Sequence, residues 1–202
     1  MSDGARLKIV QVGEQVLRGR ARNLSPEEIR GEPIQQLIAM MRDTMRDAPG
    51  VGLAAPQIGL GLRLAVIEDA PEYVSSLPEN IRIERERSPV PFHAIVNPEL
   101  SIIGAETADF FEGCLSLSGF VAAVPRARRV NVKCLNESGE EVEIDAQGWY
   151  ARILQHEIDH LNGYVYIDRM YTRSFMTSEH YSRYWGGMPV KQALLALGGR
   201  PD

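Results

Sequence analysis

Apolar residues recur at helical spacing early in the chain. Between Pro33 and about Asp47, five of them fall on one face of a helix: Ile34, Leu37, Ile38, Met41 and Met45. An earlier helix start is expected at Ser25, because a serine followed by Pro26 and by Glu28 three positions on is typical of a capped N-terminus. Residues 7–18 are expected to be extended and partly buried.

The middle of the chain alternates between apolar and polar positions, which predicts strands. Val130, Val132 and Cys134 share one face of such a strand, so the Cys134 thiol is expected to be buried. Residues 69–91 are instead polar and rich in proline, and they predict a solvated loop. The expected strands cover residues 62–67, 93–97, about 100–103 and 107–111, and a hairpin of 129–135 and 140–146 joined by residues 136–139.

Two further apolar segments follow in the last third of the chain. Residues 148–162 predict one helix, and Gly163 is placed to cap its end. Residues 190–197 are compatible with a terminal helix. Because no internal repeat or linker divides the chain, we expect one α+β domain over residues 1–202, with a C-terminal tail from about 175 to 202.

Composition excludes several classes of protein. With 202 residues, 44% of them hydrophobic and 24% charged, the chain can build a globular core. A net charge of −5 argues against a strongly basic nucleic-acid-binding surface, and no nucleic-acid motif is present. No stretch approaches the roughly 20 apolar residues that cross a bilayer, and the first residues lack the apolar core of a secretory signal. We therefore expect a cytoplasmic protein without disulfides.

The strongest chemical signal lies in residues 155–160. His156 and His160 stand four positions apart on the expected helix, so their imidazoles can bind one metal ion, and Glu157 can reach water at that ion. A helix with two surface histidines is the alternative, but the apolar neighbours predict burial, where imidazoles without partners would be costly. We expect an α+β fold, with antiparallel sheets around a central metal-binding helix and an N-terminal helix.

Two histidines leave a metal ion short of protein ligands, and the third is expected to be a histidine, a carboxylate or a thiolate. His180 lies in the tail and His93 lies beside a proline-rich segment, so both are interpreted as ordinary structural or surface histidines. Cys114 has a more distinctive setting, because Gly113 before it frees the backbone to turn. Taken alone, Cys114 is also compatible with a buried free thiol.

Three blocks together carry a resemblance to a known family: Gly-Val-Gly-Leu-Ala-Ala-Pro-Gln at 50–57, Glu-Gly-Cys-Leu-Ser at 112–116 and Gln-His-Glu-Ile-Asp-His at 155–160. In this order they resemble the signature motifs of peptide deformylases, and the likeness extends from about Ile9 to Arg169. Residues 119–120 and 148–149 are similar to the subgroup that includes organellar enzymes. The resemblance implies metal-dependent hydrolysis of the N-formyl group of formyl-methionyl peptides, with release of formate.

The resemblance also implies a role for individual residues. One divalent metal ion would be held, with Fe2+ as the native ion and Zn2+ or Ni2+ as ready replacements; the softness of the ligands also suits Co2+. The implied assignments are the metal ligands Cys114, His156 and His160, the acid/base Glu157, the oxyanion donors Gln57 and the Leu115 backbone N–H, and a methionine pocket lined by Val51, Gly52, Leu115, Trp149 and Ile153.

Further expectations concern the surroundings of this site. Ser118 stands where many relatives have proline, a departure expected to affect only the loop. Asp159 and Arg126 are expected to form an ion pair behind the metal. Nascent chains at the ribosome are the expected substrates. A homodimer through the tail is a further expectation, and truncation after Thr177 should then give a monomer.

Two other functions are also compatible with these residues. A zinc endopeptidase would use the same His-Glu-x-x-His chemistry, but with a long cleft and a third ligand other than Cys114. A non-catalytic, metal-stabilised module would close the site with four protein ligands and would leave Glu157 without a task.

Overall fold

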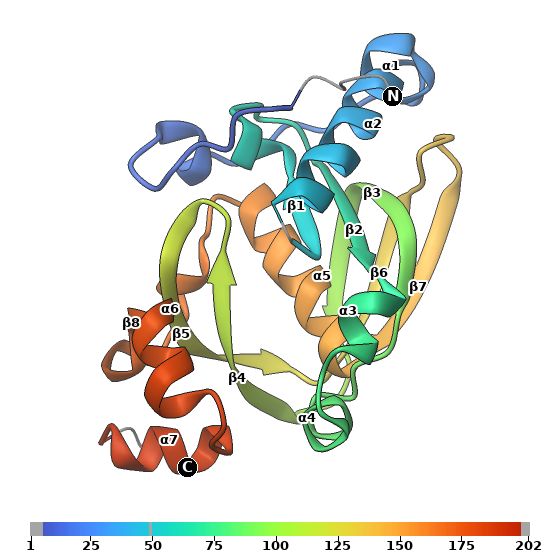
Figure 1. Cartoon of the computed structure of the whole chain (residues 1–202). Coiled ribbons are helices and arrows are strands. Elements are labelled where there is room, and N and C mark those ends of the chain that lie inside the picture. The colour runs from blue at the N-terminus through green and yellow to red at the C-terminus, as the bar shows by residue number, and fades with distance from the viewer. Residues whose placement is uncertain (1–5, 49, 199–202) are drawn as a thin grey trace.

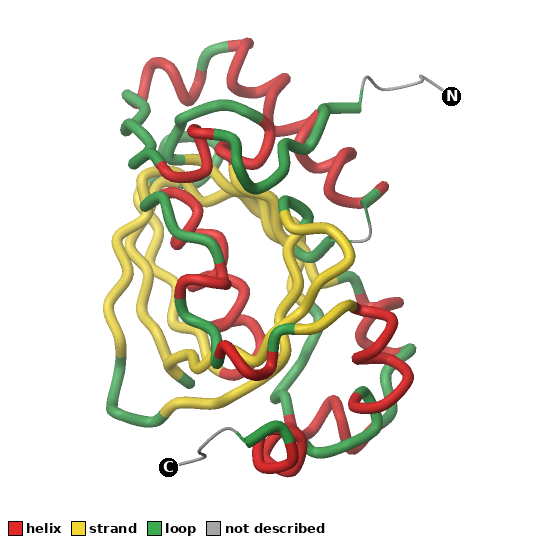
Figure 2. Tube along the Cα trace, turned by 90° about the vertical axis from the view of Figure 1, so that its left-hand side faces the viewer, coloured by secondary structure: helices red, strands yellow, loops and turns green. Residues whose placement is uncertain are grey.

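A helix runs through the middle of the molecule. The computed structural model describes residues 6–48 and 50–198; Pro49, expected to help end the N-terminal helix, lies outside these ranges. Helix α5 (Gly148–Leu161) lies between two antiparallel sheets, and Figure 2 shows strands on both sides of it. This arrangement confirms the expected α+β fold around a central helix.

The two sheets have different sizes and contribute different parts of the chain. In the five-stranded sheet the order is β1 (Gly52–Ala54), β2 (Leu64–Asp69), β3 (Val90–Ile102), β6 (Arg129–Leu135), β7 (Glu141–Gln147). In the three-stranded sheet it is β4 (Thr107–Cys114), β5 (Leu117–Ala127), β8 (Met176–Thr177). Strands β1 and β4 each lie at one edge of their sheet among the described residues.

Helices cover the ends of the molecule as well as its centre (Figure 1). Besides α5 they are α1 (Pro26–Arg30), α2 (Glu32–Asp47), α3 (Pro71–Ser75), α4 (Glu79–Glu84), α6 (Ser178–His180) and α7 (Val190–Ala196). Short turns of 3-10 helix lie at Gln15–Arg18, Ala55–Ile58, Tyr166–Asp168 and Thr172–Ser174, and a π-helical turn at Tyr181–Trp185. No helix in the described ranges is both long and apolar enough to cross a membrane.

Helices bury both faces of the larger sheet. On β2, Leu64 and Val66 belong to the core cluster that contains α2, whereas Ala65 and Ile67 belong to the cluster that contains α5. Successive strand residues point to opposite faces, so a run that is apolar throughout is expected for a strand covered on two sides. This packing fixes α5 against one face of the larger sheet.

Most of the local predictions are confirmed. Ser25 and Glu28 form the expected capping box, and Gly163 follows α5 with a φ of +83°. The N-terminal helix, the hairpin of β6 and β7, and the terminal helix lie where the pattern placed them. Cys134 is buried in β6.

Three predictions are corrected. Residues 69–91 are not simply a solvated loop, because Pro71 starts α3, Val74 is buried, and α4 follows. Residues 7–18 are not extended throughout, since they end in a 3-10 turn at Gln15–Arg18. The two segments expected near 93–103 form the single strand β3, whose pairing shifts register.

Candidate metal centre

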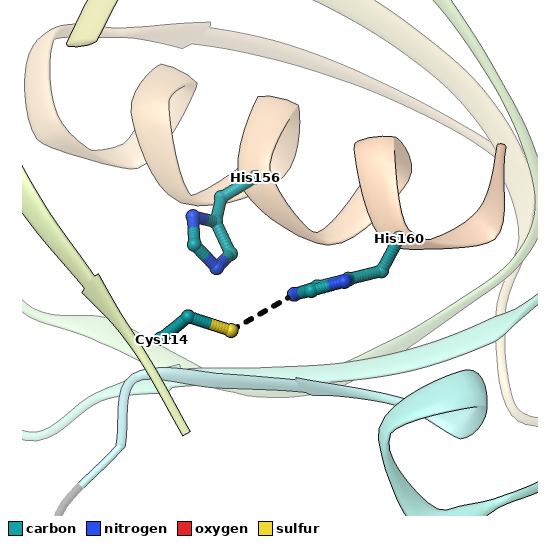
Figure 3. Close-up of side chains that lie close together, drawn as sticks. All are labelled: Cys114, His156 and His160. Atoms are coloured by element: carbon teal, nitrogen blue, oxygen red, sulfur yellow. Dashed lines mark hydrogen bonds between the residues drawn. The ribbon is translucent and has the colours of Figure 1, made fainter. Parts of the chain in front are cut away.

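Three metal-ligating side chains converge at the middle of the fold. Cys114 is the last residue of β4, where the pairing with β5 shifts register, and His156 and His160 lie one turn apart on α5. Their ligand atoms all lie within 4.8 Å of one another, and the Cys114 Sγ is 3.2 Å from the His160 Nε2. Figure 3 shows the sulfur facing both imidazole rings.

The donor set fits a divalent metal ion. One sulfur and two imidazole nitrogens suit Zn2+ or a neighbouring transition metal, and three protein ligands leave room for a fourth, non-protein ligand. The backbone N–H of Ser116 and the Gln57 Nε2 each donate to the Cys114 sulfur at 3.4 Å, which suits a thiolate. Burial lowers the pKa of the His160 imidazole well below its ordinary value, so this ring is neutral and its lone pair is available.

A buried carboxylate orients the first histidine. Glu112 Oε2 lies 3.0 Å from the His156 Nδ1, which leaves the His156 Nε2 facing the sulfur. Arg126 donates to both Glu112 oxygens, at 2.9 and 3.0 Å, and Arg152 donates to Oε1. Burial alone would raise the pKa of the Glu112 carboxyl, but Arg126 and His156 hold it well below its usual range. Glu112 is therefore an ionised acceptor beneath the metal centre.

The ion pair expected behind the site is present. Arg126 donates to Asp159 as well as to Glu112, and Arg169 donates to both Asp159 oxygens at 2.7 Å. Arg126 and Asp159 are both buried. Because Asp159 is on α5 and Glu112 is on β4, Arg126 ties the helix to the strand that carries Cys114.

Gln57 is held in one orientation. Its Oε1 accepts a hydrogen bond from the Ala54 backbone N–H at 2.8 Å, so its Nε2 is the group turned toward Cys114. The side chain is only 1% exposed. Leu115 follows Cys114, and its carbonyl accepts a hydrogen bond from Gln11 at 2.9 Å. These contacts fix both residues beside the sulfur.

Glu157 is buried beside the metal ligands. Burial raises the pKa of its carboxyl to about 7, against the effect of the nearby His156. Its Oε2 accepts no hydrogen bond from any described residue. A carboxyl group in this setting can exchange a proton near neutral pH.

A cavity of about 430 Å3 opens onto the metal centre. Among its walls are Cys114, His156 and Glu157, together with Gln57 and all five residues of the expected methionine pocket: Val51, Gly52, Leu115, Trp149 and Ile153. The edge strands β1 and β4 contribute to opposite sheets, and residues of both line the cavity. An extended segment placed there would meet β1 and β4, each an edge strand among the described residues.

Several residues at the site were not anticipated from the sequence. Glu112 could have been found, since it lies two positions before Cys114 on the same strand and therefore on the same face. Arg87 and Ser178 also line the cavity, and nothing local in the sequence points to them. His93 contacts the Tyr150 hydroxyl and His180 contacts Thr177, so both lie outside the metal group.

The Polypeptide deformylase family model matches residues 6–175. Peptide deformylase 1A, chloroplastic, from Solanum lycopersicum is 48% identical over 85% of this chain, which spans 62% of that protein. Peptide deformylase 3 of Streptomyces avermitilis is 42% identical over 98% of this chain and 86% of its own length. The mitochondrial peptide deformylase of Homo sapiens is 38% identical over 83% of this chain and 69% of its own length.

Solved structures agree with these sequence relatives. The Met-Ala-Ser-bound class I type b peptide deformylase from Acinetobacter baumannii has a TM-score of 0.73 and 34% identity, covering 83% of this chain and 99% of that one. The known activity of the family is metal-dependent removal of the formyl group from N-formyl-methionine peptides. The motifs, the geometry of the candidate metal ligands and these matches together show that the chain belongs to the polypeptide deformylase family.

Proposed function

We propose that this chain hydrolyses the N-formyl group of formyl-methionyl peptides and releases formate, using Cys114, His156 and His160 as metal ligands. The observation that carries the proposal is the convergence of these three side chains, two of which, Cys114 and His156, line one cavity together with Glu157. A cysteine as third ligand favours this reaction over the zinc endopeptidase considered above. The presence of a buried carboxyl next to the ligands disfavours a purely structural metal site.

We propose Fe2+ as the native ion, with Zn2+, Ni2+ or Co2+ able to replace it. A bound divalent ion of this kind lowers the pKa of water and polarises a carbonyl oxygen. The ligand set is compatible with all four ions, and the softness of the thiolate favours them over Mg2+ or Ca2+. Metal analysis of anaerobically purified protein tests the choice.

In the proposed reaction Gln57 and the Leu115 backbone N–H stabilise the negative charge that develops on the formyl oxygen. The hydrogen bond from Ala54 presets the Gln57 amide, so its N–H group needs no reorientation during the reaction. Removing one such donor typically costs about 2.7–4 kcal/mol of transition-state stabilisation. Glu157 accepts a proton from the attacking water and passes it to the departing amine.

We propose that the substrate binds as an additional strand. Its main chain would lie between the edges of β1 and β4, and its methionine side chain would occupy the space between Val51, Gly52, Leu115, Trp149 and Ile153. Open strand edges present N–H and C=O groups that a peptide backbone can pair with. This placement brings the formyl group toward the metal ligands.

The proposed activity is tested by formate release from formyl-Met-Ala-Ser, with acetyl-Met-Ala-Ser as the control substrate. Glu157→Ala should keep its metal and lose nearly all turnover, because the proton carrier is gone while the three ligands remain. Cys114→Ala should lose the metal as well. An active Glu157→Ala variant, or retention of stoichiometric metal in Cys114→Ala, would exclude the mechanism.

We further propose that the natural substrates are nascent chains at the ribosome, that the protein works in the cytoplasm, and that it forms a homodimer. Relatives include chloroplastic and mitochondrial proteins, so fractionation of the source cells is the test of location. Cosedimentation with translating ribosomes tests the first proposal.

A further inference from the structure

Glu157 lies against a glycine inside the cavity. The glutamate is only 4% exposed, and its Oε2 has no hydrogen-bond partner among the described residues. The position of such a carboxyl group depends on the atoms packed around it. Gly52, in β1, lines the same cavity.

No side chain fits at Gly52 while Glu157 stays in place. A Cβ on Gly52 would lie 2.2 Å from the Glu157 Oε1, 2.6 Å from its Cδ and 2.8 Å from its Cγ. These distances are well inside the roughly 3.5–4.0 Å of a favourable contact between carbon atoms. Gly52 is not among the described residues with positive φ, so its backbone conformation is open to any residue. The lack of room for a Cβ atom, and not the backbone conformation, therefore accounts for glycine at position 52.

The strand cannot easily move away to make room. Gly52 pairs with Ile67, and the carbonyl of Val51 accepts a hydrogen bond from the Glu68 N–H at 3.1 Å. Leu53 and Ala54, the next two residues, are fully buried. An added methyl group would therefore displace the glutamate side chain and leave the backbone where it is.

Two other glycines of the cavity provide a comparison. A Cβ on Gly50 would meet the Cδ1 of Leu115 at 3.0 Å, and one on Gly113 would meet the Cγ1 of Val121 at 3.5 Å. The nearest side-chain atoms in both cases are the ends of apolar side chains. Contact with Glu157 is specific to Gly52 among these three.

From this contact we infer that Gly52 is a positioning residue: it leaves the volume of one methyl group free, and the Glu157 carboxyl group occupies that volume beside His156. The inference rests on the proposed function of Glu157 as the acid/base. It is additional to any contact that Gly52 makes with substrate, because it acts through the glutamate side chain.

An activity cycle tests the inference. Gly52→Ala should lower kcat about 100-fold or more, the lower range of what general acid–base catalysis contributes, with metal content unchanged and KM changed much less. Glu157→Asp shortens the side chain and frees the contested space, so in that background the alanine should cost less than about tenfold. Gly61→Ala is the control, since a Cβ there meets nothing within 4 Å.

A thermal cycle tests the same contact without any assay of activity. Gly52→Ala should lower Tm when residue 157 is glutamate and should leave Tm nearly unchanged in a Glu157→Ala background. If Gly52→Ala alone does not fold, restoration of folding by Glu157→Ala is the expected result.

The two proposals fail in different ways. Absence of formate release by the wild-type protein would end the proposed function but not the thermal result. The inference about Gly52 would be overturned if Gly52→Ala lowered kcat by the same factor in the wild-type and Glu157→Asp backgrounds. It would also be overturned if Gly52→Ala lowered Tm by the same amount in the wild-type and Glu157→Ala backgrounds.

Discussion

Glu112 links several side chains around the candidate metal centre, although its position in the sequence does not indicate this. Its two oxygens receive hydrogen bonds from Arg126 and Arg152 and contact the His156 ring. Two buried guanidinium groups therefore balance one carboxylate that orients a proposed metal ligand. Arg126 extends this network to Asp159, so the charges of the buried group are paired.

Removing the Glu112 charge should destabilise the protein strongly at neutral pH. We expect Glu112→Gln to lower the free energy of unfolding by about 3–5 kcal/mol, because Arg126 and Arg152 would remain buried without their shared partner. Urea denaturation at pH 7 measures this difference. A loss below about 1 kcal/mol would show that the cluster adds little to stability.

The same variant should also change the response to acid. The pKa of Glu112 is depressed in the folded protein, so its contribution is complete above the unfolded value of about 4.3 and is lost as the pH falls toward the folded value. The stability difference between wild type and Glu112→Gln should therefore shrink below about pH 4. Urea titrations at several acidic pH values follow this change.

The two cysteines should differ in reactivity. Cys114 faces the cavity, whereas Cys134 is 6% exposed and burial raises the pKa of its thiol to about 11. We expect a thiol reagent to label neither residue in the metal-bound protein, Cys114 alone after chelation, and both in urea. Mass spectrometry of the labelled peptides distinguishes these states. Labelling of Cys134 before Cys114 would contradict the proposed ligand.

At the scale of helices and strands, an element could be predicted when its sequence pattern lay within its own residues. The amphipathic pattern of α2 and the alternation of β6 and β7 are contained within their own residues, and both were found. Strand β5 was missed because Pro125 interrupts its pattern. Among the described residues, β8 pairs with β5 only at Phe120 and Val121, which precede Pro125, so β8 needs no N–H group from the proline.

The site shows the same limit. The motifs predicted which three side chains would meet, and the structure brings them together. The local pattern of residues 69–91 predicts a solvated loop, because the order of this segment depends on a distant contact: the Arg85 guanidinium carbon lies 4.7 Å from the Trp149 ring centre. Within the segment, Arg87 also donates to the fully buried Asp69. A contact such as that of Arg85 with Trp149 joins positions far apart in the chain and leaves no local pattern.

We expect the packing of this segment to depend on Gly148, the first residue of α5. It has a φ of +61°, and a Cβ there would lie 2.5 Å from the Glu86 Cβ. Gly148→Ala should cost about 1–2 kcal/mol from conformation alone, and it should also raise amide hydrogen exchange across residues 79–88. Gly187→Ala, where a Cβ meets nothing within 4 Å, is the control. Unchanged hydrogen exchange would mean that contacts other than the one at Gly148 keep this segment in place.

At the scale of the whole molecule, the tail belongs to the core of the chain itself. Val190, Ala193 and Leu194 are buried in one cluster with Phe110 and Phe111 of β4. Truncation after Thr177 would uncover that cluster, so the monomer expected from such a truncation would be hard to distinguish from a misfolded chain. The single-domain organisation of residues 1–202 stays a prediction.

The outer face of the tail offers a cleaner test of the proposed homodimer. Tyr184 and Leu195 are 55% and 56% exposed. If the tail forms the interface, Tyr184→Glu combined with Leu195→Glu should convert a dimer to a monomer on a sizing column and leave Tm unchanged. A wild-type protein that already elutes as a monomer would rule out the homodimer.

If the proposed activity holds, the two strand edges that border the cavity have a consequence for the range of peptides that it can act on. Main-chain amide groups are the same in every polypeptide, so pairing with β1 and β4 would discriminate little among the residues that follow the first one. Selectivity would then fall on the blocked amino end and the side chain next to it. An enzyme built this way could act on many different polypeptides, because it would not recognise the sequence of any one of them.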